Sequence, residues 1–198
     1  MIKQQTHHRR GGKRDSRLLS RLCLLLLLVF LDCRALTADT NTDRRITVGA
    51  KLFSVLLGAD LQAERKTDSQ GNLPVRILYV DDVHAAEQAQ DALQLAAIRG
   101  MAVSLSSQSL NDYLNDADPG FAVFIAQRLN DGELEAVVKK GAEKGDILFS
   151  PFAGDVERGV LAGISVQASV RPYINRQVLQ HSGLDIKPFF LKVAKIHE

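Results

Sequence analysis

The chain has 198 residues, of which 45% are apolar and 24% are charged. This composition is ordinary for a globular protein and excludes a chain that is disordered throughout. The formal net charge of +2 comes from 25 basic and 23 acidic residues, and it is unevenly distributed along the chain.

The first 38 residues have the pattern of a secretory signal peptide. They hold eight basic and only two acidic residues around the apolar run 22–31. This run is too short for a comfortable membrane span, so we predict a cleaved leader and an exported, periplasmic protein without an integral membrane span. Cleavage can follow Ala35 or Ala38, and we prefer Ala38 because Asp39 begins a polar segment. A lipid anchor at Cys33 is disfavoured because Asp32 stands where a small residue is needed.

Leader cleavage changes the charge and the cysteine content of the protein. The remainder has 17 basic and 21 acidic residues, a net charge of −4, so no basic surface for nucleic acid is expected. Both cysteines, Cys23 and Cys33, lie in the leader. The exported domain should therefore contain no disulfide and depend on its core for stability.

We expect a polar tail over residues 39–45 and then a single domain over residues 46–198. Apolar residues recur at helical spacing from Ile46 to about Ala63. Lys51 is the only basic residue within this helix, which favours packing onto the domain over lying on a membrane. The elements expected next are a loop 64–74, strand 75–80, helix 84–99 with Gly100 as its stop, strand 101–105, a short helix near 110–114, strand 121–126, a helix capped by Asp131 and ended by Gly145, and strand 146–150.

Strands that alternate with helices predict βαβ units and a mostly parallel sheet. We therefore predict an α/β fold, a three-layer sandwich. Beyond Pro151, residues 164–170 alternate between apolar and polar, which predicts one peripheral, antiparallel strand, and Pro172 restricts it to an edge or a break. A short helix over residues 175–182 and a docked C-terminal helix from Pro188 through Ile196 complete the predicted domain.

Asp81 and Asp82 directly follow the first strand, as the acidic pair of a phosphoacceptor receiver domain does. Such a domain also needs an aspartate after the third strand and a lysine after the last one. Gln127 and Pro151 stand at those places. We therefore interpret the two aspartates as a solvated strand end in which one carboxylate caps the following helix.

No other motif predicts catalysis or a metal. His84, His181 and His197 are far apart in sequence, and there is no Gly-x-Ser-x-Gly motif or dinucleotide loop. We predict a protein that is not an enzyme and needs no cofactor or metal.

The segment 149–159 combines aromatic and charged side chains just after a strand, where open α/β sheets place their binding crevices. It could equally be a structural loop whose aromatic residues fill the core and whose charges pair. The residues predicted to bind a partner or ligand here and on the following strand are Phe149, Phe152, Asp155, Glu157, Arg158, Arg171, Tyr173 and Asn175.

The chain resembles the YfiR-like family of exported bacterial proteins. The matching segments are Gly163–Val166, Arg171–Asn175, Ser182–Ile186, the apolar residues up to Ala194, and Ala50–Phe53 in the first helix. The resemblance implies a small periplasmic α/β protein without known catalytic residues. The best-understood member restrains a membrane-bound diguanylate cyclase. The present chain lacks mature cysteines, so regulation by disulfide state is not implied for it.

Two functions follow from these observations. The first is a regulatory or sensor-adaptor protein that binds a membrane-bound diguanylate cyclase or histidine kinase, with control of cyclic-di-GMP as its most specific form. The alternative is a periplasmic solute-binding protein, with its crevice near Asp81, Gln127 and the segment 149–158. A homodimer is compatible with both functions.

Overall fold

The structure is a computed structural model that describes residues 42–198, and residues 43–198 form one compact unit. The predicted leader, its cleavage site and both cysteines lie outside the described residues. The first helix spans residues 42–59, so it begins before the predicted start and ends before Ala63. Within the described range, no helix is both long and apolar enough to cross a membrane.

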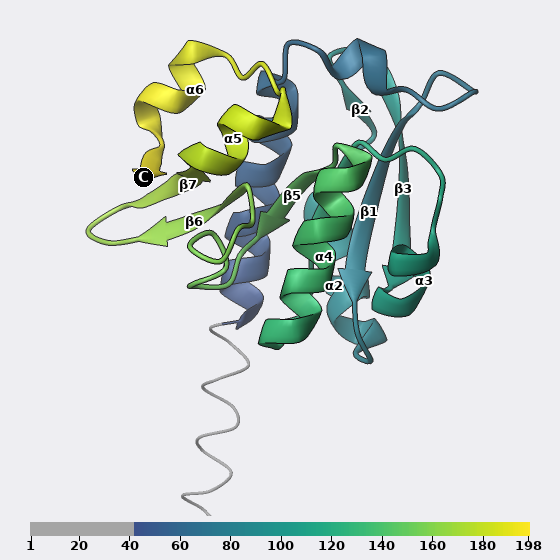
Figure 1. Ribbon diagram of the computed structural model, residues 1–198, viewed down its shortest axis with the longest axis horizontal. Coiled ribbons are helices and arrows are strands. Elements are labelled where there is room, and N and C mark those ends of the chain that lie inside the picture. The colour runs from purple at the N-terminus through teal and green to yellow at the C-terminus, as the bar shows by residue number, and fades with distance from the viewer. Residues whose placement is uncertain (1–41) are drawn as a thin grey trace, which may run out of the picture. The chain divides into compact units, whose positions relative to one another are not determined.

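An eight-stranded sheet in the order β2-β3-β1-β4-β5-β6-β7-β8 organises the domain (Figure 1). Strands β3, β1, β4, β5 and β6 are parallel, whereas β2 and β7 run antiparallel to their neighbours β3 and β6. The predicted mostly parallel sheet with a peripheral antiparallel strand near the C-terminus is therefore confirmed, whereas the antiparallel β2 was not predicted. The strands are β1 (Leu73–Tyr79), β2 (Ala97–Ile98), β3 (Met101–Ser109), β4 (Ala122–Ile125), β5 (Ile147–Ser150), β6 (Ala162–Val166), β7 (Val170–Asn175) and β8 (Lys195–His197).

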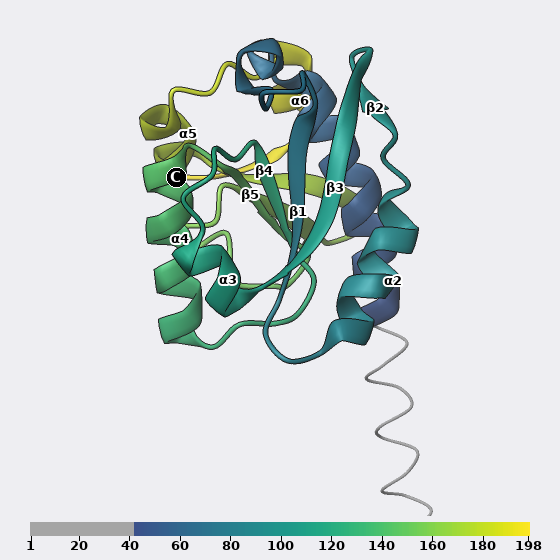
Figure 2. The same ribbon diagram turned by 90° about the vertical axis from the view of Figure 1, so that its right-hand side faces the viewer.

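Helices cover both faces of this sheet, as predicted for a three-layer sandwich. Figure 2 shows α3 and α4 on one face, with α2 and the helix over residues 42–59 on the other. The remaining helical elements are η1 and the two C-terminal helices α5 and α6. The bounds are η1 (Ala63–Lys66), α2 (Val83–Leu93), α3 (Leu110–Asn115), α4 (Asp131–Lys144), α5 (Arg176–Ser182) and α6 (Pro188–Val193).

The helix over residues 42–59 packs directly onto the central strands. The rings of Phe53, Phe124 and Phe149 lie with their centroids 5.4–5.6 Å apart. Gly49 permits this approach, because a Cβ atom there would lie 2.9 Å from the Pro151 Cβ and 3.3 Å from the Phe149 ring. The packing role predicted for this helix is confirmed.

The predicted helix over residues 84–99 is too long. α2 ends at Leu93, and Gln94 adopts a left-handed conformation with φ 43°. Residues 97 and 98 instead form β2, which turns back onto β3 through Arg99 and Gly100, both with positive φ. This pairing satisfies backbone groups of β3 that a longer helix would leave unpaired, and helical periodicity cannot show it.

The C-terminal elements also differ from the prediction. Residues 164–170 contain not one strand but the end of β6 and the start of β7, which pair as a hairpin. Pro172 lies in β7 at a place that faces β6 alone, because β8 pairs only from Tyr173 onward. The expected edge position of this proline is confirmed. The last helix ends at Val193, and Ile196 belongs to β8 rather than to that helix.

Helix α4 is capped by Asn130 and not by Asp131. The Asn130 side chain accepts a hydrogen bond from the Glu133 N–H, and the Glu133 carboxylate accepts one from the Asn130 N–H. This capping box satisfies two backbone donors at the helix start. The predicted stop at Gly145 is confirmed by its left-handed conformation, φ 71°.

Candidate functional site

The carboxyl ends of β1 and β4 are the position at which this topology would place a ligand. The five parallel strands follow the order second, first, third, fourth, fifth along the chain, so the order reverses beside β1. Asp81 and Asp82 follow β1 at this point, and Gln127 follows β4. The solute-binding crevice of the second predicted function was expected at these strand ends.

Gln127 occupies this position with its own side chain. Its Oε1 accepts hydrogen bonds from the backbone N–H groups of Val80, Asp81 and Asp82 at 2.9, 3.1 and 3.0 Å. Its Nε2 donates to Asp81 Oδ1 at 2.5 Å. Asp82 accepts from the Ala85 N–H at 3.1 Å, which confirms the predicted cap of α2. The amide of Gln127 thus uses the donors that a bound anion would need.

Three of the predicted binding residues are buried, Phe149 in β5 and Phe152 and Asp155 in the loop between β5 and β6. Phe149 and Phe152 are buried, and Asp155 has no exposed surface. Asp155 accepts from Ser150 Oγ at 2.5 Å, and its backbone carbonyl accepts from the Val160 N–H at 3.1 Å. These contacts fix the loop against the sheet and give the three residues a structural role.

Glu157, Arg158 and Arg171 are the predicted residues that lie at the surface. Arg158 pairs with Asp155 at 2.5 Å and also contacts Asp131 of α4. The hydrogen bond with Asp155 raises the pKa of the Arg158 guanidinium. Arg158 therefore joins the loop to α4 while keeping part of its side chain accessible.

The structure brings Glu157 together with Tyr173, although 16 positions separate them in sequence. The Tyr173 hydroxyl lies 3.4 Å from His197 Nδ1, and Lys195 Nζ lies 4.5 Å from the Tyr173 ring centroid. Burial, followed by the negative charge of Glu157, raises the pKa of Tyr173. Of the remaining predicted residues, Asn175 is buried and donates to the Val156 carbonyl at 2.8 Å.

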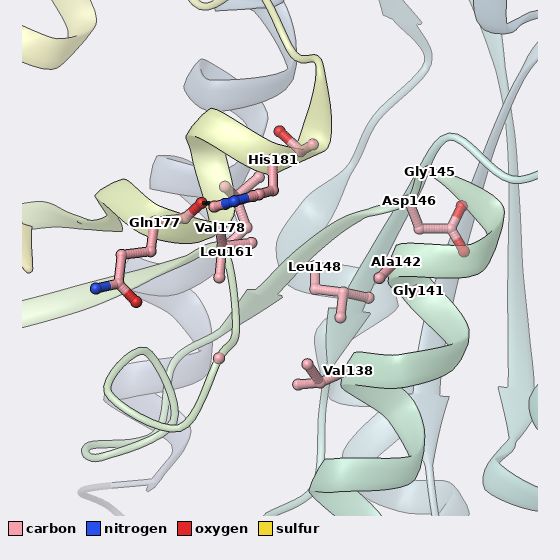
Figure 3. Close-up of a pocket in the computed structure, with 12 residues that line it drawn as sticks. Val138, Gly141, Ala142, Gly145, Asp146, Leu148, Leu161, Gln177, Val178 and His181 are labelled. Carbon is pink, nitrogen blue, oxygen red and sulfur yellow. Dashed lines mark hydrogen bonds between the residues drawn. The ribbon is translucent and has the colours of Figure 1, made fainter.

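A cavity of about 330 Å³ lies between α4, β5 and α5 (Figure 3). Most of its wall is apolar, and glycine and alanine residues of α4 and the loop leave the space open. The sequence suggests only turns at these glycines. It cannot predict the cavity, because a space between helices depends on how they pack across the sheet. The lining residues are Val138, Gly141, Ala142, Gly145, Asp146, Leu148, Gly159, Leu161, Gln177, Val178, His181 and Ser182.

Polar groups at the α5 side of this cavity are suited to accept a hydrogen bond. His181 Nδ1 lies 2.7 Å from the Gln177 carbonyl oxygen (Figure 3). A carbonyl only accepts, so the Nδ1 of a neutral His181 carries the proton, and its Nε2 is left as an acceptor. The cavity could thus hold a compact apolar molecule that carries an N–H or O–H group.

Exposed apolar side chains lie on α6 and on the β6–β7 hairpin, and α6 packs beside β7 (Figure 1). Val166 and Val170 lie on the hairpin and Phe189 and Val193 on α6, and their exposed fractions are 47–58%. They are four of the seven large apolar residues that are exposed in the part of the chain that the structure describes. We call these four residues the C-terminal surface.

A buried polar cluster lies beneath α3. Asp116 pairs with Arg76 at 2.9 Å and with Lys144 at 3.1 Å. Burial alone would raise the pKa of Asp116, but the N–H of Asp118, Lys144 and the charge of Arg76 together lower it to about 2. Burial raises the pKa of Asp146, which accepts from the Tyr113 hydroxyl at 2.9 Å. These groups tie α3 and α4 to β1.

Comparison with known proteins adds information on the fold. No protein-family model matches the chain, and no curated protein matches it. Among solved structures, it is similar to an ABC domain in complex with L-Trp from Streptococcus pneumonia, with a TM-score of 0.54 and 11% identity. The match covers 77% of the present chain and 62% of that chain. At this identity the likeness shows a shared α/β fold and nothing about residues or ligands.

Proposed function

We propose that this chain is a non-catalytic, exported regulatory protein that binds a membrane-bound signalling protein, as its resemblance to the YfiR-like family implies. The observation that best supports a binding role is the C-terminal surface, because exposed apolar side chains on neighbouring elements are typical of protein interfaces. A diguanylate cyclase is the first partner to test, and a histidine kinase is the second.

Charged side chains accompany this apolar surface. Arg171 follows Val170 on the hairpin, and Lys192 and Lys195 flank Val193. All three are exposed. Interfaces commonly combine an apolar centre with a charged rim that sets specificity and the rate of association. This arrangement fits an acidic, partly apolar segment of a partner.

Capture from detergent-solubilised membranes of the source cell tests the proposal. Wild-type protein should retain a membrane-bound signalling protein, and the double variant Phe189→Asp/Val193→Asp should lose it. Val83→Asp is the matched control, since Val83 is 52% exposed and Val193 is 53% exposed, but Val83 begins α2. Retention of the same protein by the double variant would show that another surface makes the contact, and failure to capture any signalling protein would refute the function.

A second candidate function is solute binding, which the cavity between α4 and α5 favours. L-Trp is a reasonable first probe, because a protein of similar fold has been solved with it. Ala142→Leu should fill the cavity and abolish a ligand-induced rise in melting temperature. Ala136→Leu on the same helix is the control, because Ala136 does not line the cavity. An equal response from both variants would place the ligand elsewhere.

A further inference from the structure

Strand β3 forms a long and largely open edge of the sheet. It spans Met101–Ser109, but β2 pairs with it only at Met101 and Ala102, and one further hydrogen bond joins the Val103 N–H to the Ala96 carbonyl. Figure 2 faces this edge and shows β2 beside one end of β3 alone. In the part of the chain that the structure describes, the rest of β3 has a neighbouring strand on one side only, namely β1.

The backbone groups on this open side follow from the pairing pattern. Alternate residues of a strand direct their N–H and C=O groups to the same side. Since the Val103 N–H points toward β2, Leu105 and Ser107 point their backbone groups the same way, past the end of β2. Within residues 42–198, neither residue pairs with a strand on that side. These donors and acceptors are available for another strand.

Strand β3 lacks the features that usually protect an edge strand from pairing with another strand. Proteins normally protect edge strands by making them short or by placing charges or proline on them. The opposite edge follows this rule, because β8 has only three residues and carries Lys195. Strand β3 has nine residues and contains no charged residue and no proline. Its exposed residues are small and neutral, namely Ala102, Ser104, Ser106 and Ser107.

We propose that β3 pairs antiparallel with β3 of a second copy of this chain, about a twofold axis at Ser106. Leu105 of each copy then exchanges backbone hydrogen bonds with Ser107 of the other, and the two Ser106 residues face each other as a non-hydrogen-bonded pair, with Cα atoms about 4.5 Å apart. A second copy is favoured over a charged partner because a neutral strand meets no like-charge repulsion when it pairs with itself. This inference does not depend on the proposed function.

Analytical ultracentrifugation of the exported chain, starting at Asp39, tests this pairing. The wild type should form dimers with a dissociation constant of roughly 100 µM, because the interface is small. Ser106→Lys should weaken the dimer about fivefold, since it places like charges opposite each other. Ser106→Glu should do the same, and an equimolar mixture of the two variants should form a heterodimer at least as tight as the wild-type dimer.

Ser104→Lys is the matched control, because Ser104 lies on the same exposed face of β3 but would oppose Gln108 of the second copy. It should dimerise like the wild type. Ser107→Pro removes an outward N–H without touching the bonds to β1 and should also weaken the dimer. A wild type that stays monomeric up to roughly 1 mM would overturn the proposal. Equal dissociation constants for Ser106→Lys and Ser104→Lys would overturn the pairing register and with it the proposed interface.

Discussion

Asp155→Ala should destabilise the fold, even though Asp155 lies in the loop predicted to bind a partner. The side chain has no exposed surface, and its carboxylate accepts from Ser150 Oγ and from the Arg158 guanidinium, each at 2.5 Å. Removing it leaves the buried Ser150 hydroxyl without its acceptor. The loop then loses its main attachment to the end of β5.

The magnitude follows from the two contacts. A buried hydrogen bond to a charged acceptor contributes about 1.5–3 kcal/mol. The pair with Arg158 adds at most about 1 kcal/mol, because that side chain is 33% exposed and screened by solvent. The free energy of unfolding should therefore fall by about 2–4 kcal/mol. For a domain of this size the melting temperature should fall by roughly 5–12 °C.

Urea unfolding followed by circular dichroism at pH 7 measures this difference. Arg158→Ala is the control, because the Arg158 side chain is 33% exposed and its loss leaves the Ser150–Asp155 hydrogen bond in place, so it should cost no more than about 1 kcal/mol. The reasoning would be refuted by an Asp155→Ala variant within about 0.5 kcal/mol of the wild type, which is the range of ordinary surface substitutions.

Four further substitutions test other parts of the fold. Gly163→Ala places a Cβ atom 2.6 Å from the Ser150 carbonyl oxygen and should cost about 2 kcal/mol or more in urea unfolding. Gly132→Ala on the exposed side of α4 should instead stabilise by about 0.5–1 kcal/mol. Gln127→Met should cost about 1–2 kcal/mol and speed amide hydrogen exchange at the end of β1, where three N–H groups lose their acceptor. The folded-state pKa of Asp116, about 2, lies below its ordinary value of 3.8, so this carboxylate should stabilise the fold by about 2 kcal/mol above pH 4 and lose that contribution as the pH falls toward 2. Asp116→Asn should remove this part of the pH dependence, and an unchanged slope between pH 4 and 2 would contradict it.

Local patterns in the sequence predicted the fold class and most of its elements. Alternation of buried strands with amphipathic helices is a property of short windows, so β1, β4, β5 and α4 were identified close to their observed positions. Residues with strong local preferences also behaved as expected: Asp82 caps α2, and Gly145 ends α4. The resemblance to the YfiR-like family and its functional consequences remain predictions.

The tertiary structure decided which residues meet. Gln127 lies 46 positions from Asp81, yet its side chain closes the strand ends where a crevice was predicted. The predicted binding residues divide into a buried group around Asp155 and an exposed group that includes Glu157 and Arg171. The cavity beside α5 and the open edge of β3 depend on which elements become neighbours. Periodicity along the chain determines which side of an element is apolar, but strand order and packing across the sheet determine what that side touches, and that information is not local.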